Sequence, residues 1–274
     1  MVDHMTNRTI FITGASRGIG KAIALKLAAS GARIVIASKT ETPHPKLDGT
    51  IYTAAEEIER AGGEALPLVC DIRDEAQINA AVGAAVARFG GIDVLVNNAS
   101  AISLSQTEQT EAKRFDLMHQ INVRGTFLVS KACLPHLRKG NNPHILTLAP
   151  PLSQDPRWLG AYLAYTLSKF GMSMVAIGLA TELSGAGIAS NTLWPRTTIA
   201  TAAVRNLLGG DALAAMSRTP EIVADAAAII LARAAASCTG HHFIDEDVLR
   251  EEGVSDFSRY AVDPTQPLAP DLFL

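Results

Sequence analysis

The chain has 274 residues, of which 48% are hydrophobic and 19% are charged. This composition excludes a largely disordered chain, and the length is enough for one sizeable hydrophobic core. The formal net charge of −3 provides no broad positive field of the kind that attracts nucleic acid, so we expect no nucleic-acid partner.

Short apolar runs alternate with longer helical stretches along the chain. The runs typical of buried strands are residues 9–13, 33–38, 65–70, 92–96, 144–148, 188–194 and 242–244. The stretches typical of helices are residues 21–30, 53–61, 75–89, 112–138, 161–183 and 221–235. This alternation predicts βαβ units, whose crossover helices cover both faces of a parallel sheet. We therefore expect an α/β fold with a doubly wound, Rossmann-like parallel sheet of about seven strands.

The predicted elements belong to one domain over residues 1–274, with its core at residues 9–244 and a C-terminal tail at residues 245–274. Residues 40–50 contain two prolines and a glycine, which predicts a loop. The tail is charged at first, then carries three prolines and ends in Leu272-Phe273-Leu274. This apolar end favours docking of the tail on the domain or on a neighbouring copy.

The three cysteines, Cys70, Cys133 and Cys238, are widely spaced and odd in number. The sequence therefore predicts neither a disulfide framework nor a metal site. The first eight residues lack the apolar stretch of a signal peptide, and the longest apolar runs are too short or too charged to span a bilayer. We expect a cytoplasmic protein without a membrane span.

The sequence Thr-Gly-Ala-Ser-Arg-Gly-Ile-Gly at residues 13–20 lies between the first predicted strand and the first predicted helix. A dinucleotide-binding loop requires this context. Gly14 allows a tight turn, Gly18 lets the backbone approach a pyrophosphate, and Gly20 lets the helix pack close to the strand. The phosphates would lie at the helix N-terminus, where free N–H groups favour anions. The alternative is a glycine-rich turn that binds no ligand.

The end of the second predicted strand indicates which dinucleotide binds. NAD(H) usually meets an Asp or Glu there, whereas this strand ends in Ser38-Lys39. Arg17 and Lys39 are available to pair with a ribose 2′-phosphate, and Ser38 can donate a hydrogen bond to it. The sequence therefore predicts NADP(H) rather than NAD(H), and Glu41 in the following loop is the residue that argues the other way.

Polar residues also follow the third and fourth predicted strands. Asp71 is placed to reach the adenine amino group, and Asn97-Asn98-Ala99 comes directly after the fourth strand. The carboxyl ends of strands line the ligand crevice in open parallel sheets. An Asn pair can also form a simple turn, so this feature has little weight by itself.

Tyr165 and Lys169 are four residues apart in a predicted helix, so both side chains lie on one face, one turn apart. A phenol has an unperturbed pKa of roughly 10, and a neighbouring ammonium lowers this pKa because it stabilises the phenolate. Tyr165 could then donate a proton to a carbonyl oxygen in reduction, or accept one from an alcohol in oxidation. A Tyr and a Lys can also share a helix face by chance, and the glycine loop upstream is what gives the pair its weight.

These motifs together resemble the ordered signature of the short-chain dehydrogenase/reductase family. The residues that carry the resemblance are residues 13–20, Asn97-Asn98-Ala99, Asn122, Tyr165 and Lys169. It covers residues 9–244, and within the family residues 148–195 are similar to the hydroxysteroid dehydrogenase-like branch. Members of that branch carry an additional C-terminal sterol-carrier domain, which we do not expect within these 274 residues.

The resemblance implies that Tyr165 is the general acid/base, that Lys169 lowers its pKa and holds the nicotinamide ribose, and that Asn122 supports a helix kink and a water of a proton relay. The cofactor residues that it implies are Gly14, Ser16, Arg17, Gly18, Ile19, Gly20, Ser38, Lys39, Asp71, Asn98, Ala99, Lys169, Pro195, Thr197 and Ile199. It also implies a substrate lid within residues 196–217, and a homodimer or homotetramer formed through the helix at residues 161–183.

The match fails at one catalytic position. Members of the family carry a serine between the fifth strand and the tyrosine, which hydrogen-bonds the substrate oxygen, whereas Leu152 stands at that position here. Ser153 is the nearest hydroxyl, and it is either a catalytic substitute or an ordinary loop serine. The loss of one preorganised donor to a developing oxyanion costs on the order of 3 kcal/mol in transition-state stabilisation.

We therefore expect an NADP(H)-dependent oxidoreductase that interconverts a carbonyl and a secondary alcohol. The apolar residues of the lid segment favour a lipophilic substrate, steroid-like or fatty-acyl. A 3-oxoacyl thioester reductase is one alternative. An NADP(H)-binding protein with little catalysis is the other, and the altered serine position is the reason to consider it.

Overall fold

The computed structural model describes residues 5–43 and 47–274, so part of the predicted loop at residues 40–50 lies outside the described residues. The strands are β1 (Thr9–Thr13), β2 (Arg33–Ser38), β3 (Glu64–Val69), β4 (Val94–Asn97), β5 (His144–Leu148), β6 (Ala189–Trp194) and β7 (His242–Ile244). The α-helices are α1 (Gly18–Ala28), α2 (Ile51–Arg60), α3 (Glu75–Phe89), α4 (Ala112–Met118), α5 (Thr126–Leu137), α6 (Pro156–Ala161), α7 (Leu163–Glu182), α8 (Gly210–Ala215), α9 (Glu221–Ala232) and α10 (Asp245–Glu251). Shorter helical segments are η1 (Thr107–Gln109), η2 (His119–Gly125), η3 (Ser184–Ala186), η4 (Val204–Leu208), η5 (Ala235–Ser237) and η6 (Ser258–Tyr260).

The seven strands form one sheet in the order β3-β2-β1-β4-β5-β6-β7, and every neighbouring pair is parallel. The predicted doubly wound parallel sheet is therefore confirmed. The strand order reverses between β1 and β4, and ligands of open α/β sheets bind at the carboxyl ends of the strands beside such a point.

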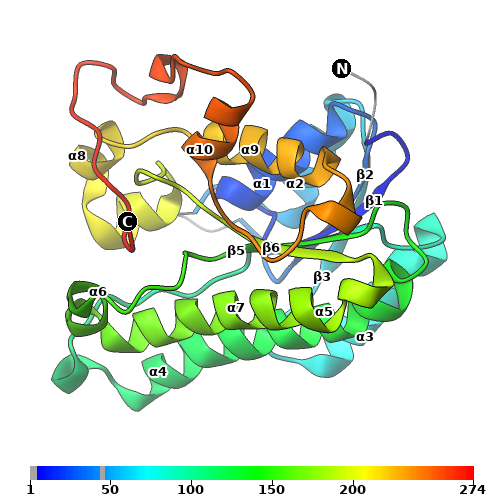
Figure 1. Cartoon of the computed structure of the whole chain (residues 1–274), viewed down its shortest axis with the longest axis horizontal. Helices are drawn as coiled ribbons and strands as arrows, with labels where there is room; N and C mark the ends of the chain where they lie inside the picture. The colour runs from blue at the N-terminus through cyan, green and yellow to red at the C-terminus, as the bar shows by residue number, and fades with distance from the viewer. Residues whose placement is uncertain (1–4, 44–46) are drawn as a thin grey trace.

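Helices cover both faces of the sheet (Figure 1): α1, α2, α9 and α10 lie on one face, and α3, α5 and α7 lie on the other. Because side chains alternate along a strand, β1 directs Ile10 and Ile12 into the first core and Phe11 into the second. All three side chains are fully buried. Burial on both faces explains why the strands of this sheet are continuous apolar runs in the sequence.

The largest difference from the predicted elements concerns the helix expected at residues 112–138. The chain instead forms α4, the π-helical turn η2 and α5 in succession. Asn122, inside η2, bonds to the backbone of Ala101: its Oδ1 accepts from the N–H at 2.7 Å and its Nδ2 donates to the carbonyl oxygen at 2.9 Å. A π-helical turn of this kind widens the helix locally and is frequent at functional sites.

The sequence does not predict α6 or α10. Asp155 caps α6, since its carboxylate accepts from the backbone N–H of Arg157 at 2.9 Å and Pro156 occupies the first helical turn. The helix α10 begins directly after β7 and has three acidic residues in its first turn, where the helix dipole favours negative charge. Most other element boundaries differ from the prediction by at most three residues.

The helix α7 is the one described helix that is long and apolar enough to cross a membrane, judged by length and composition. Buried core helices pass the same test, and 61% of its most apolar stretch is buried inside the protein.

A group of buried polar residues holds the end of α9 against the amino ends of the strands. Arg8 donates to the carbonyl oxygens of Leu231 at 2.9 Å and Asn142 at 2.6 Å. Nε2 of His144 lies 3.0 Å from the carbonyl oxygen of Arg233, so the neutral ring donates its hydrogen there. Burial lowers the pKa of His144 to about 4, and the Arg8 guanidinium acts in the same direction.

Protonation of His144 is expected to destabilise the fold in acid. The pKa is about 4 in the folded protein and near the ordinary value of 6.5 in the unfolded chain. As the pH falls through this window, the unfolded chain takes up a proton that the folded protein does not, and the free energy of unfolding falls by roughly 3 kcal/mol. We expect His144→Gln to lose this part of the pH dependence in urea denaturation between about pH 7 and about pH 4.5. The exposed residue His241, changed to Gln, is the control, and the same pH dependence in His144→Gln as in wild type would contradict the prediction.

Candidate active site

The glycine loop lies between β1 and α1, and two left-handed glycines give it its shape. Gly14 has φ 69° and Gly18 has φ 58°, a region that other L residues rarely adopt. Gly20 lies in the first turn of α1, and a Cβ there would collide with Nδ2 of Asn98. The helix therefore starts in direct contact with the residue that follows β4.

Asn98 and Thr13 join the carboxyl ends of β4 and β1. Nδ2 of Asn98 donates to the carbonyl oxygens of Thr13 at 2.9 Å and Gly14 at 3.1 Å. In return, Oγ1 of Thr13 accepts from the backbone N–H groups of Asn98 at 3.0 Å and Ala99 at 3.1 Å. The structure thus brings the predicted cofactor residues of the glycine loop and of the β4 end into one group.

The end of β2 lies beside the same loop. The hydroxyl oxygens of Ser16 and Ser38 are 3.4 Å apart. Arg17 donates from Nε to the carbonyl oxygen of Asp48 at 2.9 Å, and from Nη2 to that of Gly49 at 2.6 Å. Ser16 and Ser38 therefore lie together where the ribose of a bound dinucleotide is expected, and Arg17 holds the loop that precedes α2.

Charged groups surround this corner of the sheet. Lys39 is exposed, and its ammonium interacts with the carboxylate of Asp71. The guanidinium of Arg73 hydrogen-bonds Asp71 and holds the pKa of that carboxyl below its usual range. Glu41 is exposed, and its carboxylate accepts a long bond of 3.5 Å from the hydroxyl of Tyr52.

The segment after β6 offers an unpartnered polar atom. Pro195, Thr197 and Ile199 are buried, as is expected of residues that border a nicotinamide. Oγ1 of Thr197 has no hydrogen-bond partner among the described residues. An unpaired buried hydroxyl is costly, so this atom is available to a ligand. Together with the glycine loop, the donor set fits a nicotinamide dinucleotide.

Tyr165 and Lys169 lie one turn apart on α7, where they are 5% and 2% exposed. Nζ of Lys169 donates to the carbonyl oxygen of Leu148, the last residue of β5, at 2.6 Å. It also lies 4.9 Å from the centre of the Trp194 ring. Burial lowers the pKa of Lys169 to about 7 and raises the pKa of Tyr165, because both charged forms lose water. The sequence predicts a lowered Tyr165 pKa, whereas in the structure burial and the Asp271 carboxylate both raise it.

Asn122 reaches this pair through Ser168, a residue that the sequence analysis does not single out. Nδ2 of Asn122 donates to Oγ of Ser168 at 2.9 Å, and Ser168 donates to the carbonyl oxygen of Tyr165 at 2.8 Å. Asn122 and Ser168 are fully buried. The structure therefore brings Tyr165, Lys169 and Asn122 together, and a helix-interior serine packed against η2 is the link between them.

Neither Leu152 nor the two residues that directly follow β5 carry a hydroxyl that could replace the family's serine. Ala149 and Pro150 follow β5, and the carbonyl oxygen of Pro150 accepts from Oγ of Ser173 at 2.6 Å. Ser153 is half-buried, and its Oγ accepts from the backbone N–H of Asp155 at 3.1 Å, within the turn that leads into α6. Its role as a catalytic substitute stays a prediction.

The C-terminal tail covers Tyr165, and Figure 1 shows the C-terminus descending toward α6 and the start of α7. The ring centre of Phe273 is 6.1 Å from that of Tyr165. Its distances to the rings of Trp158, Phe170 and Trp194 are 5.7, 5.3 and 5.9 Å. The sequence predicts that the tail docks, and the structure places its end in the candidate active site.

The tail also brings Asp271 to the site, and sequence reasoning missed this carboxyl. Burial raises the pKa of Asp271 to about 7, whereas the backbone N–H of Leu272 and the ammonium of Lys169 oppose the shift. The same carboxyl interacts electrostatically with Tyr165. The only sequence signal is the apolar run at residues 272–274, which predicts that the tail docks but not where Asp271 lies.

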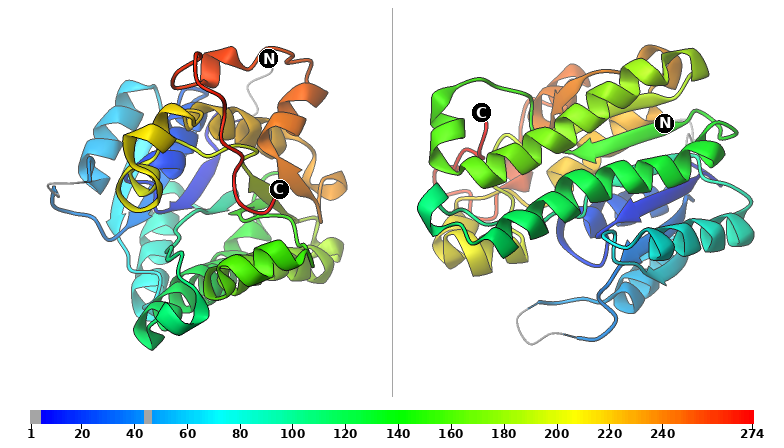
Figure 2. Two further views of the ribbon diagram at one scale, coloured as in Figure 1. Left: turned by 90° about the vertical axis from the view of Figure 1, so that its left-hand side faces the viewer. Right: turned by 90° about the horizontal axis from the view of Figure 1, so that it is seen from below.

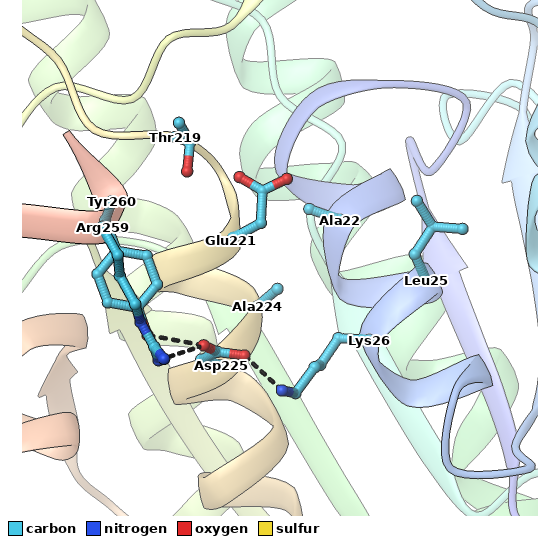
Figure 3. A pocket seen from close by; sticks show the side chains of 9 residues that line it. All are labelled: Ala22, Leu25, Lys26, Thr219, Glu221, Ala224, Asp225, Arg259 and Tyr260. Carbon is cyan, nitrogen blue, oxygen red and sulfur yellow. Dashed lines mark hydrogen bonds and ion pairs between the residues drawn. The ribbon is translucent and has the colours of Figure 1, made fainter. Parts of the chain in front are cut away.

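Other regions offer weaker candidates. Across residues 5–43 and 47–274, no group of three or more His, Cys, Asp and Glu side chains is arranged to hold a metal ion. A pocket of about 560 Å³ lies between α1 and α9 (Figure 3). Its Asp225 lies 2.6 Å from Nζ of Lys26 and accepts from the hydroxyl of Tyr260 at 2.7 Å. These charges satisfy one another, and the pocket shares no residue with the candidate active site.

Comparison with known proteins agrees with this geometry. A family model for short chain dehydrogenases matches residues 8–211. Hydroxysteroid dehydrogenase-like protein 2 of Danio rerio is 60% identical over 266 residues, which are 97% of this chain and 63% of that protein. The chain spans 50–63% of the length of the curated relatives of this kind that it matches.

Solved structures agree as well. A putative dehydrogenase from Xanthomonas campestris has a TM-score of 0.96 and 57% identity, with 98% of each chain covered. A metagenomic short-chain oxidoreductase in complex with NADP has a TM-score of 0.70 and 27% identity, covering 88% of this chain and 97% of the other. The chain belongs to the short-chain dehydrogenase/reductase family, and within it is similar to hydroxysteroid dehydrogenase-like proteins.

Proposed function

We propose that this protein is an NADP(H)-dependent oxidoreductase that interconverts a carbonyl and a secondary alcohol on a lipophilic substrate. The oxidoreductase class and a nicotinamide cofactor follow from the family. The convergence of Tyr165, Lys169 and Asn122 beside the ends of β5 and β6 is the observation that carries the proposal. The aromatic and aliphatic side chains around Tyr165 support a lipophilic substrate.

A nicotinamide dinucleotide held by the glycine loop would supply or accept the hydride, and the protein's own residues donate or accept the proton. In reduction, Oη of Tyr165 donates its proton to the carbonyl oxygen of the substrate; in oxidation, it accepts the proton of the alcohol. The ammonium of Lys169 stabilises the phenolate that remains after donation. Asn122 and Ser168 hold the turn of α7 that carries Tyr165 in place.

Tyr165→Phe keeps the ring that packs against Phe273 and removes the proton donor. We expect NADPH oxidation to fall by roughly 10²- to 10⁴-fold, the usual contribution of a general acid. The assay uses a panel of aliphatic ketones, steroid ketones and 3-oxoacyl thioesters, with Tyr52→Phe on the exposed face of α2 as the matched control. Full turnover in Tyr165→Phe would rule out the proposed role.

The same panel separates the two alternatives. Turnover of acyl thioesters without turnover of free ketones selects a 3-oxoacyl thioester reductase. Tight NADPH binding without turnover of any compound selects a binding protein with little catalysis, which Ala149, Pro150 and the turn-bound Ser153 favour. If Ser153 acts as the substitute donor, Ser153→Ala slows turnover by roughly two decades or more; unchanged turnover assigns the serine to the loop alone.

A preference for NADP(H) is supported by the end of β2. Ser38, Lys39 and Arg17 offer a hydroxyl and two cations, and no carboxylate immediately follows the strand. Glu41, which could instead bind a free ribose hydroxyl, is near the hydroxyl of Tyr52. The metagenomic relative, which is 27% identical, was solved with NADP.

Lys39→Ala is expected to weaken NADPH binding by about tenfold or more, because it removes a charge-assisted bond to the 2′-phosphate. NADH binding is expected to change by less than about twofold, since NADH lacks that phosphate. Calorimetric titration measures the dissociation constants of NADPH and NADH, and so their ratio, without any need for turnover. Lys131→Ala on the exposed face of α5 is the control. An equal loss of affinity for both cofactors would exclude Lys39 as the discriminating residue.

We propose that the protein forms a homodimer or homotetramer through the face that α5 and α7 share. Figure 2 shows these helices side by side in the view from below. Leu163, Leu167 and Met174 form a stripe on α7 and are 38%, 45% and 62% exposed. Phe127 on α5 adds a ring that is 52% exposed. Exposed apolar side chains gathered in this way favour association with a second copy.

The double variant Phe127→Glu with Met174→Glu is expected to shift the protein to monomers, since it places buried, unpaired carboxylates in the interface. Light scattering coupled to gel filtration gives the mass in solution. Tyr52→Glu, an exposed apolar residue on α2, is the control. An assembly that stays intact in the double variant would place the interface elsewhere.

We further propose that residues 1–274 form a single domain and that the protein is cytoplasmic. All three cysteines are free and buried, as suits a reducing compartment.

A further inference from the structure

The end of the tail, residues 262–273, lies over the candidate active site and is called the strap; it makes a turn at residues 263–266 and then runs to Phe273 beside Tyr165. Two contacts fasten it to the segment after α8: the N–H of Val262 donates to Ser217 at 3.0 Å, and that of Ala269 donates to Met216 at 2.8 Å. On its other side, the N–H of Thr198 donates to the carbonyl oxygen of Ala269 at 3.0 Å. The strap thus lies between two parts of the predicted lid segment: residues 216–217, and the stretch around Thr198 where the nicotinamide is expected.

The last residues of the strap turn inward. The N–H of Asp271 donates to the carbonyl oxygen of Arg196 at 3.1 Å, and Nε1 of Trp194 donates to that of Leu272 at 2.8 Å. Phe273 then has φ 76°, a conformation that a bulky L residue adopts only where its surroundings hold it. Its side chain is among aromatic rings and the residue is 4% exposed.

Phe273 and a substrate compete for the same neighbours. Proton transfer requires the substrate oxygen to come within hydrogen-bond distance of Oη of Tyr165, so the adjoining carbon skeleton must lie beside the Tyr165 ring. In the described structure Tyr165 is 5% exposed, and the Phe273 ring lies next to it, among Trp158, Phe170 and Trp194.

We propose that Phe273 determines substrate size, because its ring fills the apolar space beside Tyr165 that a bulky substrate has to enter. This inference rests on the proposed function, in which Tyr165 faces the substrate carbonyl. A small ketone needs little of this space, whereas a polycyclic or long-chain ketone has to displace the ring. The specificity of the site is then set by the strap as well as by the lid.

The two tryptophans give a direct measurement of this displacement. The chain contains only Trp158 and Trp194, and the Phe273 ring is next to both. Their fluorescence therefore reports occupation of the space beside Tyr165, whether or not turnover occurs. The probes are a steroid ketone and a four-carbon ketone, each titrated into wild type, Phe273→Leu and Phe273→Ala. Leu268→Ala, an exposed position of the strap, is the matched control.

Phe273→Ala is expected to tighten binding of the steroid ketone by roughly tenfold or more relative to the small ketone, the scale set by burial of a large apolar side chain. The ratio of the two dissociation constants in Phe273→Leu is expected to lie between those of wild type and Phe273→Ala. Leu268→Ala is expected to leave this ratio unchanged. The ratio of kcat/KM for the two ketones is expected to follow the same order. A ratio that stays within about twofold of wild type in both Phe273 variants would overturn the proposal. Thermal denaturation confirms that each variant is folded.

Failure of the proposed function gives a different result. If Tyr165 is not the acid, Tyr165→Phe keeps its turnover. The fluorescence titrations of the Phe273 variants do not depend on turnover, so they still decide whether Phe273 selects substrates by size. If Phe273 has no role, Tyr165→Phe loses turnover and the ratio of dissociation constants is the same in every strap variant.

Discussion

The hydrogen bonds between Asn98 and Thr13 are the constraint on which the rest of the candidate site depends. They fasten the carboxyl end of β4 to that of β1, where the strand order reverses. Asn98 fills the space beside Gly20, so the first turn of α1 has to be free of a side chain there. With α1 held in this way, its N-terminus lies at the carboxyl ends of β1 and β4, beside the end of β2. A change at Asn98 would thus disturb the cofactor loop and the sheet together.

Much of the fold could be predicted from the sequence because its signals are local. The runs that form β1 and β2 are apolar on both faces, and the glycine loop between β1 and α1 needs left-handed residues at Gly14 and Gly18. The break at Asn122 is different, since the one glycine of this stretch, Gly125, stands at the end of η2 and does not explain the π-helical turn. Its cause is a pair of bonds to Ala101, which is 21 residues earlier in the chain. Periodicity within a helix cannot show such a contact.

Part of the candidate site was also predictable from the sequence. The Tyr165 and Lys169 pair was predictable from helical spacing together with the glycine loop upstream, and the structure links Asn122 to the turn of Tyr165 through Ser168. The position of Phe273 does not follow from any local pattern, because its partners are on α6, α7 and β6. The apolar end of the tail predicts that the tail docks. The docking site, however, depends on which aromatic surface the folded domain leaves exposed.

The strap and the chemistry of Tyr165 are physically coupled. Burial disfavours both the phenolate of Tyr165 and the ammonium of Lys169. The Asp271 carboxylate opposes only part of the resulting fall in the Lys169 pKa. A site in this state holds a protonated tyrosine beside a lysine whose charge is easily lost. If a substrate displaces Phe273 as proposed, water or a polar substrate group that reaches Lys169 would favour its charged form, and a charged Lys169 would favour the phenolate of Tyr165. In the proposed mechanism, the displacement of Phe273 that admits a bulky substrate would therefore also promote the proton transfer at Tyr165.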